Sequence, residues 1–260
     1  MSIINSLKEI YKYRNMVNYF TRSELRNRYK GSVLGVFWSI LNPLFLLLLY
    51  SFVFSFVMKI SIPNYLLFLF SGLVPWICFK SSILTSSGSI VGNGGLIKKV
   101  YFPREIIVLS SVMSNFINMF IALILIVPLL FVYQVPINKY YLLLPLVIIV
   151  QFIFTLSLSM IVSAFTVFVR DLRQILDIVM MGLFYTTPIV YKTDMIPEKI
   201  QDFFNINPIA IIIKFYQDVI YHNQMPNIMS LAVLSVCCIA MLYISHKIFS
   251  HLSKWFAEHV

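Results

Sequence analysis

The chain alternates long uncharged apolar stretches with short segments in which its charges gather. A helix that crosses a bilayer needs roughly 20 consecutive, mostly apolar residues. Six stretches meet this condition, so the pattern predicts an all-α polytopic membrane protein with six transmembrane helices. An even number of spans leaves both termini on the same side of the membrane. The predicted spans are about 33–58, 63–90, 106–133, 140–169, 174–191 and 228–247.

Residues 1–32 precede the first span and show a different pattern. Ile3, Leu7 and Tyr11 recur at helical spacing, with charged residues on the opposite face. This is typical of an amphipathic helix in the membrane interface, and a plain surface helix is the alternative. The segment 22–30 is densely basic and adjoins the first span, as expected of a connector that contacts anionic lipid headgroups.

Two loops between the spans are also distinctive. Loop 91–105 is rich in glycine and then carries Lys98, Lys99 and the pair 104–105. We predict a docking surface for a cytoplasmic partner there, with a solvated turn as the alternative. External loop 192–227 has nearly balanced charges and apolar segments too short or too charged to span. We predict short re-entrant or interfacial helices in it, at 196–204 and 209–220, because backbone at membrane depth must be buried in protein or line a cavity.

Composition agrees with a membrane protein. Of the 260 residues, 60% are hydrophobic and 12% are charged, whereas an ordinary soluble domain is roughly 25% charged. So little charge cannot coat a water-facing surface, and the high hydrophobicity excludes a disordered chain. The three cysteines do not make a disulfide-stapled secreted module.

The net charge of +10 would suggest nucleic-acid binding in a soluble protein. Its distribution changes that interpretation. Fourteen of the 20 Lys and Arg residues fall on the side that holds both termini, and five fall on the other side. Because Lys and Arg are enriched in cytoplasmic segments, the bias places both termini and the tail 249–260 in the cytoplasm. We expect contacts with membrane lipids and no nucleic acid.

Enzyme chemistry is not visible in the sequence. The chain has no Gly-x-x-x-x-Gly-Lys-Ser/Thr motif, so it is not expected to bind ATP through a P-loop. Its four histidines lack metal-ligand spacing, and no Ser/His/Asp arrangement is evident. We predict no catalytic residue, no metal site and no cofactor on this chain.

Two charged side chains lie inside predicted spans. Asp177 follows Arg173 by four residues, so a helical ion pair is expected. Lys80 lies well inside its span, where a charge is costly and indicates a functional site. A lysine that extends its amine toward the interface is the alternative, and both interpretations stay open.

Four segments carry a resemblance to a known family. Residues 28–44 read RYKGSVLGVFWSILNPL, residues 92–105 read GNGGLIKKVYFPRE, and TPIVY and NINPIAIIIKFY stand at 187–191 and 205–216. With the chain length and the predicted spans, they resemble ABC-2-type polysaccharide export permeases, the transmembrane subunits of O-antigen, teichoic acid or capsular polysaccharide ABC transporters. Relatives often carry an arginine after the last of these segments, where this chain has Gln217. Any role of that arginine is therefore not carried over.

The resemblance implies a homodimer that works with two copies of a separate nucleotide-binding ATPase. ATP and magnesium would bind to that partner and not to this chain. The N-terminal helix and loop 91–105 would contact the ATPase. The residues predicted for that contact are Ile3, Leu7, Tyr11, Lys98, Lys99, Phe102, Pro103, Arg104 and Glu105.

The implied cargo is a glycan on a polyprenyl pyrophosphate carrier. Because cations favour phosphate, basic residues near the inner boundary are candidates to contact the pyrophosphate. They are Arg26, Arg28, Lys30 and Lys80. Aromatic faces stack on sugar rings, so some aromatic residues are candidates to line a glycan path, with lipid-facing or interfacial belt positions as the alternative. These candidates are Trp38, Tyr50 and Trp76.

The predicted function is the permease subunit of an ATP-driven exporter that moves a lipid-linked polysaccharide, O-antigen-like or teichoic-acid-like, across the bacterial cytoplasmic (inner) membrane. One alternative is an ABC-2 exporter of a drug or small lipid. An integral membrane enzyme acting on lipid-linked sugars would need clustered acids or histidines, and a pore without ATP coupling would need no ATPase. The sequence does not distinguish O-antigen from capsule or teichoic acid.

Overall fold

A computed structural model describes residues 3–136, 138–197, 199, 201, 204 and 206–260, without the side chains of residues 3–7. The described residues form helices and connecting turns, with no strand among them. The main helices are α1 (Ile3–Lys12), α2 (Arg14–Tyr29), α3 (Trp38–Ser51), α4 (Tyr65–Gly92), α5 (Gly94–Lys99), α6 (Glu105–Leu123), α7 (Ile126–Val132), α8 (Leu144–Phe168), α9 (Leu172–Tyr185), α11 (Pro208–Ile220), α12 (Ile228–Leu252) and α13 (Phe256–His259). Short 3-10 or π-helical turns are η1 (Gly35–Phe37), η2 (Phe52–Val57), η3 (Lys139–Leu143), η4 (Thr193–Met195) and η5 (Ser253–Trp255).

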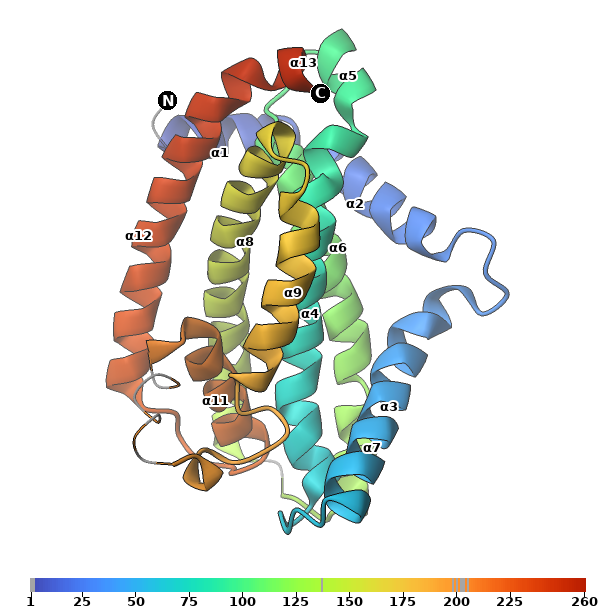
Figure 1. Cartoon of the computed structure of the whole chain (residues 1–260), viewed down its shortest axis with the longest axis vertical. Coiled ribbons are helices and arrows are strands. Elements are labelled where there is room, and N and C mark those ends of the chain that lie inside the picture. The colour runs from blue at the N-terminus through green and yellow to red at the C-terminus, as the bar shows by residue number, and fades with distance from the viewer. Residues whose placement is uncertain (1–2, 137, 198, 200, 202–203, 205) are drawn as a thin grey trace.

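Helix α4 is the centre of the bundle, and α3, α6, α8, α9 and α11 pack around it (Figure 1). Within their most apolar windows, 78% of the α4 residues are buried, against 11% in the segment that contains α3. Small polar residues let neighbouring backbones approach α4 closely. Several of their hydroxyls donate within the helix; Ser82, for example, donates to the carbonyl of Cys78 at 2.7 Å.

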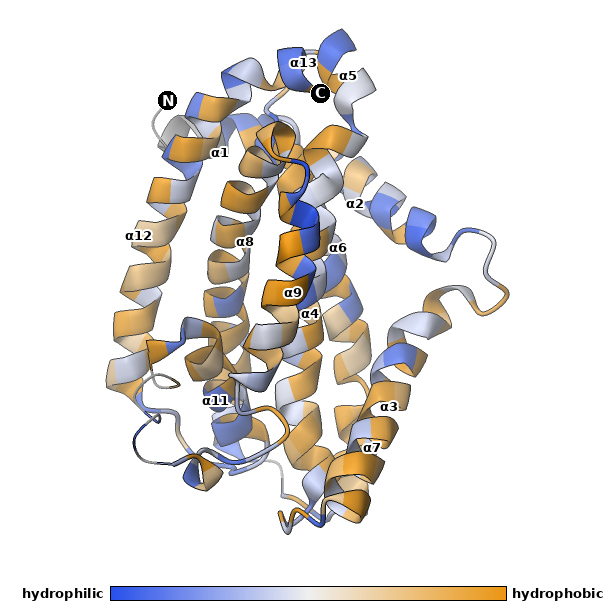
Figure 2. Cartoon of the chain, viewed as in Figure 1, coloured by the Kyte–Doolittle hydropathy of each residue, from blue (hydrophilic) through white to orange (hydrophobic). Residues whose placement is uncertain are grey.

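The two ends of the bundle hold different segments (Figure 1). Both termini and α5 lie at one end, while the turn between α3 and α4 and the loops around α11 lie at the other. This agrees with an arrangement in which both termini share one side of the membrane. Apolar residues dominate the helices between the two ends, and α2 is distinctly more hydrophilic (Figure 2). That the shared end faces the cytoplasm stays a prediction from the charge distribution.

Five helical segments of the described chain are long and apolar enough to cross a membrane. They correspond to the predicted spans except 174–191. In that region α9 has 14 residues, so it is roughly 21 Å long, whereas the hydrocarbon core is about 30 Å thick. The all-helical membrane fold is confirmed, and the count of six spans stays a prediction.

The N-terminal segment is helical, as predicted, but it forms two helices rather than one helix and a connector. The chain bends at Tyr13, between α1 and α2. Helix α2 then continues through the basic segment and packs against α6, where Val17 and Thr21 are buried. Gly31 follows Lys30, the residue that ends α2. Its φ is +78°, a backbone conformation that glycine adopts without strain. The chain turns there from α2 toward α3.

The predicted external loop contains a buried helix. Most residues of α11 are buried against α4 and α8, and Ile213 and Tyr216 are fully enclosed. This is the burial that a re-entrant helix requires. Asn207 caps α11 by accepting a hydrogen bond from the backbone of Ile209. The other helix expected in this loop, at 196–204, lies partly outside the described residues.

Candidate functional site

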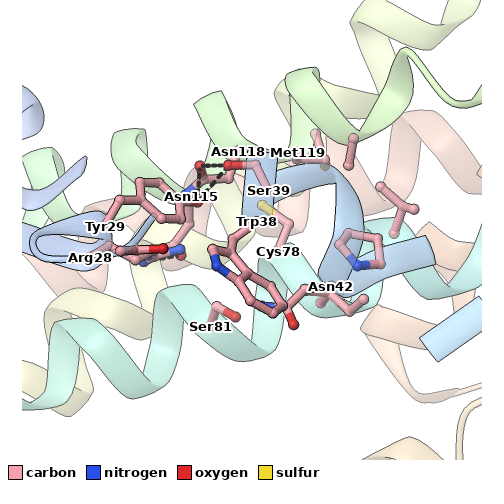
Figure 3. A pocket seen from close by; sticks show the side chains of 15 residues that line it. Arg28, Tyr29, Trp38, Ser39, Asn42, Cys78, Ser81, Asn115, Asn118 and Met119 are labelled. Atoms are coloured by element: carbon pink, nitrogen blue, oxygen red, sulfur yellow. Dashed lines mark hydrogen bonds between the residues drawn. The ribbon is translucent and has the colours of Figure 1, made fainter. Parts of the chain in front are cut away.

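A cavity of about 310 Å³ lies where the end of α2 meets α3, α4 and α6. Arg28 and Tyr29 reach it from α2, Ser39 from α3, and Asn115 and Asn118 from α6 (Figure 3). We call these five residues the Arg28 cluster. Its position follows from the turn after α2, which brings Ser39 of α3 back to Tyr29 at the basic end of α2.

Arg28 is fixed in place by an asparagine on α6. Its Nη2 donates to Asn115 Oδ1 at 2.8 Å. The amide nitrogen of Asn115 is committed elsewhere, because it donates to Thr85 Oγ1 at 3.0 Å and to the carbonyl of Ser111 at 2.9 Å. The amide oxygen is therefore oriented toward Arg28. A guanidinium has five N–H donors. Among the described residues, Arg28 forms one side-chain hydrogen bond, the one to Asn115, so other donors remain for a ligand.

A second set of hydrogen bonds joins α2, α3 and α6 beside the cavity. The hydroxyls of Tyr29 and Ser39 contact each other, and both reach Asn118 Oδ1 at 2.9 Å (Figure 3). The nitrogen of Asn118 is buried without a hydrogen-bond partner among the described residues. A buried donor without a partner costs about 1–3 kcal/mol, so this position favours an acceptor. No carboxylate is among the residues that line the cavity, and the arrangement suits an anion such as phosphate.

The other basic residues predicted to contact pyrophosphate do not line this cavity. Arg26 is exposed and lies by a separate surface depression with Arg22. Lys30 is exposed at the end of α2, and Lys80 is half-buried on α4. The structure therefore separates Arg28 from the other three candidates.

The three candidate path aromatics also differ in position. Trp38 lines the cavity. Tyr50 stacks on Phe184 of α9 with ring centroids 5.5 Å apart. Trp76 is 3% exposed and packs against Phe79 and Phe184, so its ring faces are covered by protein. In this structure the ring joins α4 to α9, and a place for Trp76 on a glycan path stays a prediction.

The predicted ATPase-contact residues divide into exposed and inward-facing groups. Lys98 and Lys99 are exposed at the end of α5, followed by the exposed Val100 and Tyr101, the latter 89% exposed. We call Lys98–Tyr101 the exposed knuckle. Phe102 is 4% exposed because it stacks on Phe20 of α2. The Phe102 side chain is thus buried in the protein, whereas its neighbour Tyr101, which is not among the predicted contacts, is exposed.

The remaining predicted contacts pack onto the protein to different degrees. Pro103 and Arg104 are half-buried, and Glu105 Oε1 lies 3.9 Å from His246 Nε2 on α12. Tyr11 is exposed on α1, with the Arg14 guanidinium 5.0 Å from its ring centre. The side chains of Ile3 and Leu7 lie outside the described part of the chain.

A second polar group lies deeper, between α4, α8 and α11. Gln151 Nε2 donates to the carbonyl of Pro75 at 2.9 Å, and the Tyr216 hydroxyl donates to Gln151 Oε1 at 2.6 Å. Gln217 donates to the carbonyl of Pro188 at 2.8 Å. We call Gln151, Tyr216 and Gln217 the Gln151 cluster. Its side chains are buried and neutral, and all three donate hydrogen bonds.

Two further expectations concern charges and metal ligands. The Asp177–Arg173 ion pair is not present among the described residues. The guanidinium of Arg173 lies instead against Gly88 of α4, where a Cβ would be 3.5 Å from it. Within the described part of the chain, no three His, Cys, Asp or Glu residues gather in a way that could hold a metal ion.

Comparison with known proteins places this architecture in a family. Residues 17–221 match the ABC-2 type transporter family. The chain belongs to that family. The match extends from α2 to the end of α11, so it includes both polar clusters and the exposed knuckle. The chain is accordingly a multi-pass membrane transport subunit.

Three curated relatives are similar over nearly the whole chain. An O-antigen export system permease protein RfbA from Klebsiella pneumoniae is 39% identical over 239 residues, covering 92% of each chain. An RfbA protein from Myxococcus xanthus is 32% identical over 260 residues, covering 99% of this chain and all of the relative. The polysialic acid transport protein KpsM from Escherichia coli is 24% identical over 234 residues, covering 85% and 87%.

Proposed function

We propose that this chain is the permease component of a bacterial export system that moves a lipid-linked, O-antigen-like polysaccharide across the cytoplasmic membrane. The observation that carries the proposal is the 39% identity to an O-antigen export permease over 92% of both chains. The glycan is carried on a polyprenyl pyrophosphate. A teichoic-acid-like glycan, a drug or a small lipid is the competing cargo.

The Arg28 cluster supports a phosphate contact within this function. Its cavity is lined by Arg28, which keeps unused N–H donors, and cationic N–H donors bind phosphate oxygens strongly. The same cavity has apolar walls from Val74, Ile77 and Met119. A polar patch beside apolar walls fits the point where the pyrophosphate joins the polyprenyl chain. In this proposal Arg28 holds the pyrophosphate at the inner boundary.

Energy comes from a separate ATPase. Two copies of this chain form a homodimer with two ATPase subunits, and ATP and magnesium bind to those subunits. The exposed knuckle supports such a contact, because Lys98, Lys99 and Tyr101 protrude at the end where both termini lie. ATP shifts the permease between conformations only to the extent that it binds them with different affinity.

The test compares two arginines on α2 in a host whose own copy of the gene is deleted. Arg28→Gln should reduce surface glycan by more than tenfold and cause lipid-linked glycan to accumulate inside the cell. Arg26→Gln removes the same charge from a residue outside the cavity, and it should export normally. Association with the ATPase and the dimer should be intact in both variants.

Two results would contradict the proposal in different ways. If Arg28→Gln and Arg26→Gln export equally well, Arg28 does not contact the phosphate. If deletion of the gene causes no lipid-linked glycan to accumulate, the cargo is not a glycan and the drug or small-lipid alternative gains support.

A further inference from the structure

The last residues of the chain fold back over the loop that carries the exposed knuckle. Beyond α12 the chain makes one 3-10 turn and the short helix α13, and α13 lies beside α5 (Figure 1). We call residues 253–260 the hook. Phe256 anchors it, because this ring is fully buried with Phe249 at 5.4 Å and Phe168 at 6.3 Å between ring centroids.

The hook contacts α5 at a glycine. A methyl group at Gly94 would overlap the side chain of Val260, with Val260 Cγ1 as the nearest atom. The neighbouring Gly95 has nothing within 4 Å of the same position. Neither glycine has a positive φ, so backbone conformation does not demand glycine at either site. Close approach of the hook is what restricts residue 94.

The other side of the loop also meets the hook. The Arg104 guanidinium lies 5.9 Å from the ring centre of Phe256, and Glu105 faces His246 on α12. The exposed knuckle is therefore held from both sides by α12 and its extension. Helix α12 in turn packs along α8, whereas α5 is joined through the chain to α4 and α6.

We propose that the hook is a positioning element that fixes the orientation of α5 and links its movement directly to α12. Resting on the proposed function, a push by the ATPase on the exposed knuckle then reaches both the α4–α6 pair and the α8–α12 pair. Gly94, Phe256 and Val260 are its positioning residues. Without the contact, the ATPase still binds and hydrolyses ATP, but less of that cycle drives export.

The first experiment measures the contact without transport. Trypsin cleaves after exposed lysines, and Lys98 and Lys99 lie at the end of α5. In membrane vesicles, Gly94→Ala should be cleaved there at least threefold faster than the wild type. Gly95→Ala adds the same methyl group to the same helix and should be cleaved at the wild-type rate.

A rescue variant separates the overlap from other effects of the substitution. Val260→Gly removes the two side-chain atoms nearest to the added methyl, leaving the backbone carbon of residue 260 at 3.6 Å. Gly94→Ala combined with Val260→Gly should be cleaved at the rate of Val260→Gly alone. Equal cleavage of Gly94→Ala and Gly95→Ala would overturn the proposed contact.

The second experiment measures coupling in the complex with the ATPase. Gly94→Ala should lower glycan exported per ATP hydrolysed at least fivefold, while Gly95→Ala leaves that ratio unchanged. A variant that is merely less stable loses both activities in proportion and keeps the ratio. An unchanged ratio despite faster cleavage would overturn the positioning role. Absence of glycan export by the wild type would instead refute the proposed function, and the cleavage result would still decide the contact.

Discussion

The Arg28 cluster and the Gln151 cluster both place hydrogen-bonding side chains among apolar helices, but they differ in charge and in access. The first holds a guanidinium and opens onto a cavity of about 310 Å³. The second is neutral, and Gln151 and Tyr216 are fully buried. In the first, Asn118 has a buried amide nitrogen without a described partner; in the second, the amide nitrogens of both glutamines have acceptors.

This difference separates a binding site from a structural contact. Buried polar groups whose hydrogen bonds are satisfied stabilise one arrangement of helices. Arg28 is exposed and keeps unused N–H donors beside the cavity, which an anion can accept. The Gln151 cluster therefore joins α4, α8 and α11, whereas the Arg28 cluster is arranged to receive an anion. Four predictions test this distinction.

The largest effect is expected from Gln151→Leu, which removes the centre of the neutral cluster. The carbonyl of Pro75 and the hydroxyl of Tyr216 then lose their partner, and the free energy of unfolding should fall by about 2 kcal/mol. Thermal unfolding in detergent measures this. The matched variant Gln174→Leu, at an exposed position, should unfold as the wild type does. Equal unfolding of the two variants would show that the buried bonds contribute nothing.

The next effect concerns the open cluster and should change transport without changing stability. Asn118→Asp replaces the unpaired donor with an acceptor that repels phosphate and neutralises Arg28. Export should fall about tenfold, which corresponds to about 1.4 kcal/mol. Unfolding should be within experimental error of the wild type. Normal export by Asn118→Asp would exclude a phosphate at this position.

A smaller effect is expected from Tyr216→Phe. This change removes one hydroxyl and leaves Gln151 Oε1 without a donor, while the bond from Gln151 to Pro75 stays. The loss should be about 1 kcal/mol. Combined with Gln151→Leu, it should add almost nothing, because residues in one hydrogen-bond network are not additive. Full additivity in unfolding measurements would mean that the two side chains act independently.

Much of the fold follows from the hydrophobic pattern. Five predicted spans and the N-terminal helical segment match the structure, since long uncharged runs have few alternatives in a bilayer. Region 174–191 is different. Its composition suits a span, but Pro188 follows α9 closely and the chain has left the helix by Thr186. The turn after Tyr185 sets the length of α9, and a hydropathy profile does not predict where such a turn lies.

The candidate site was predicted only in part. Arg28 was one of four basic candidates, and sequence does not show which of them faces α6. Asn115 and Asn118 are three residues apart, so they lie on one face of α6, and that spacing was a usable signal. Phe102 and Tyr101 are adjacent aromatics of similar size, and packing against Phe20 decides which one is buried. Such choices depend on tertiary contacts rather than on local pattern.

The smallest predicted effect is a pH dependence confined to the end of the molecule that holds the Gln151 cluster. Burial lowers the pKa of His222, just after α11, below its ordinary value; Asp218 and Asp194 oppose this, and Lys192 and Lys214 reinforce it. The folded state thus disfavours the charged imidazole. The contribution of the neutral His222 to folded-state stability is fully present above the unfolded pKa of about 6.5. This contribution is lost as the pH falls below that value.

Unfolding of the wild type and of His222→Gln at about pH 7.5 and pH 5.5 measures this contribution, with the variant accounting for every other group that titrates. The wild type should lose more stability than the variant on acidification. Equal losses in wild type and variant would remove His222 as the cause.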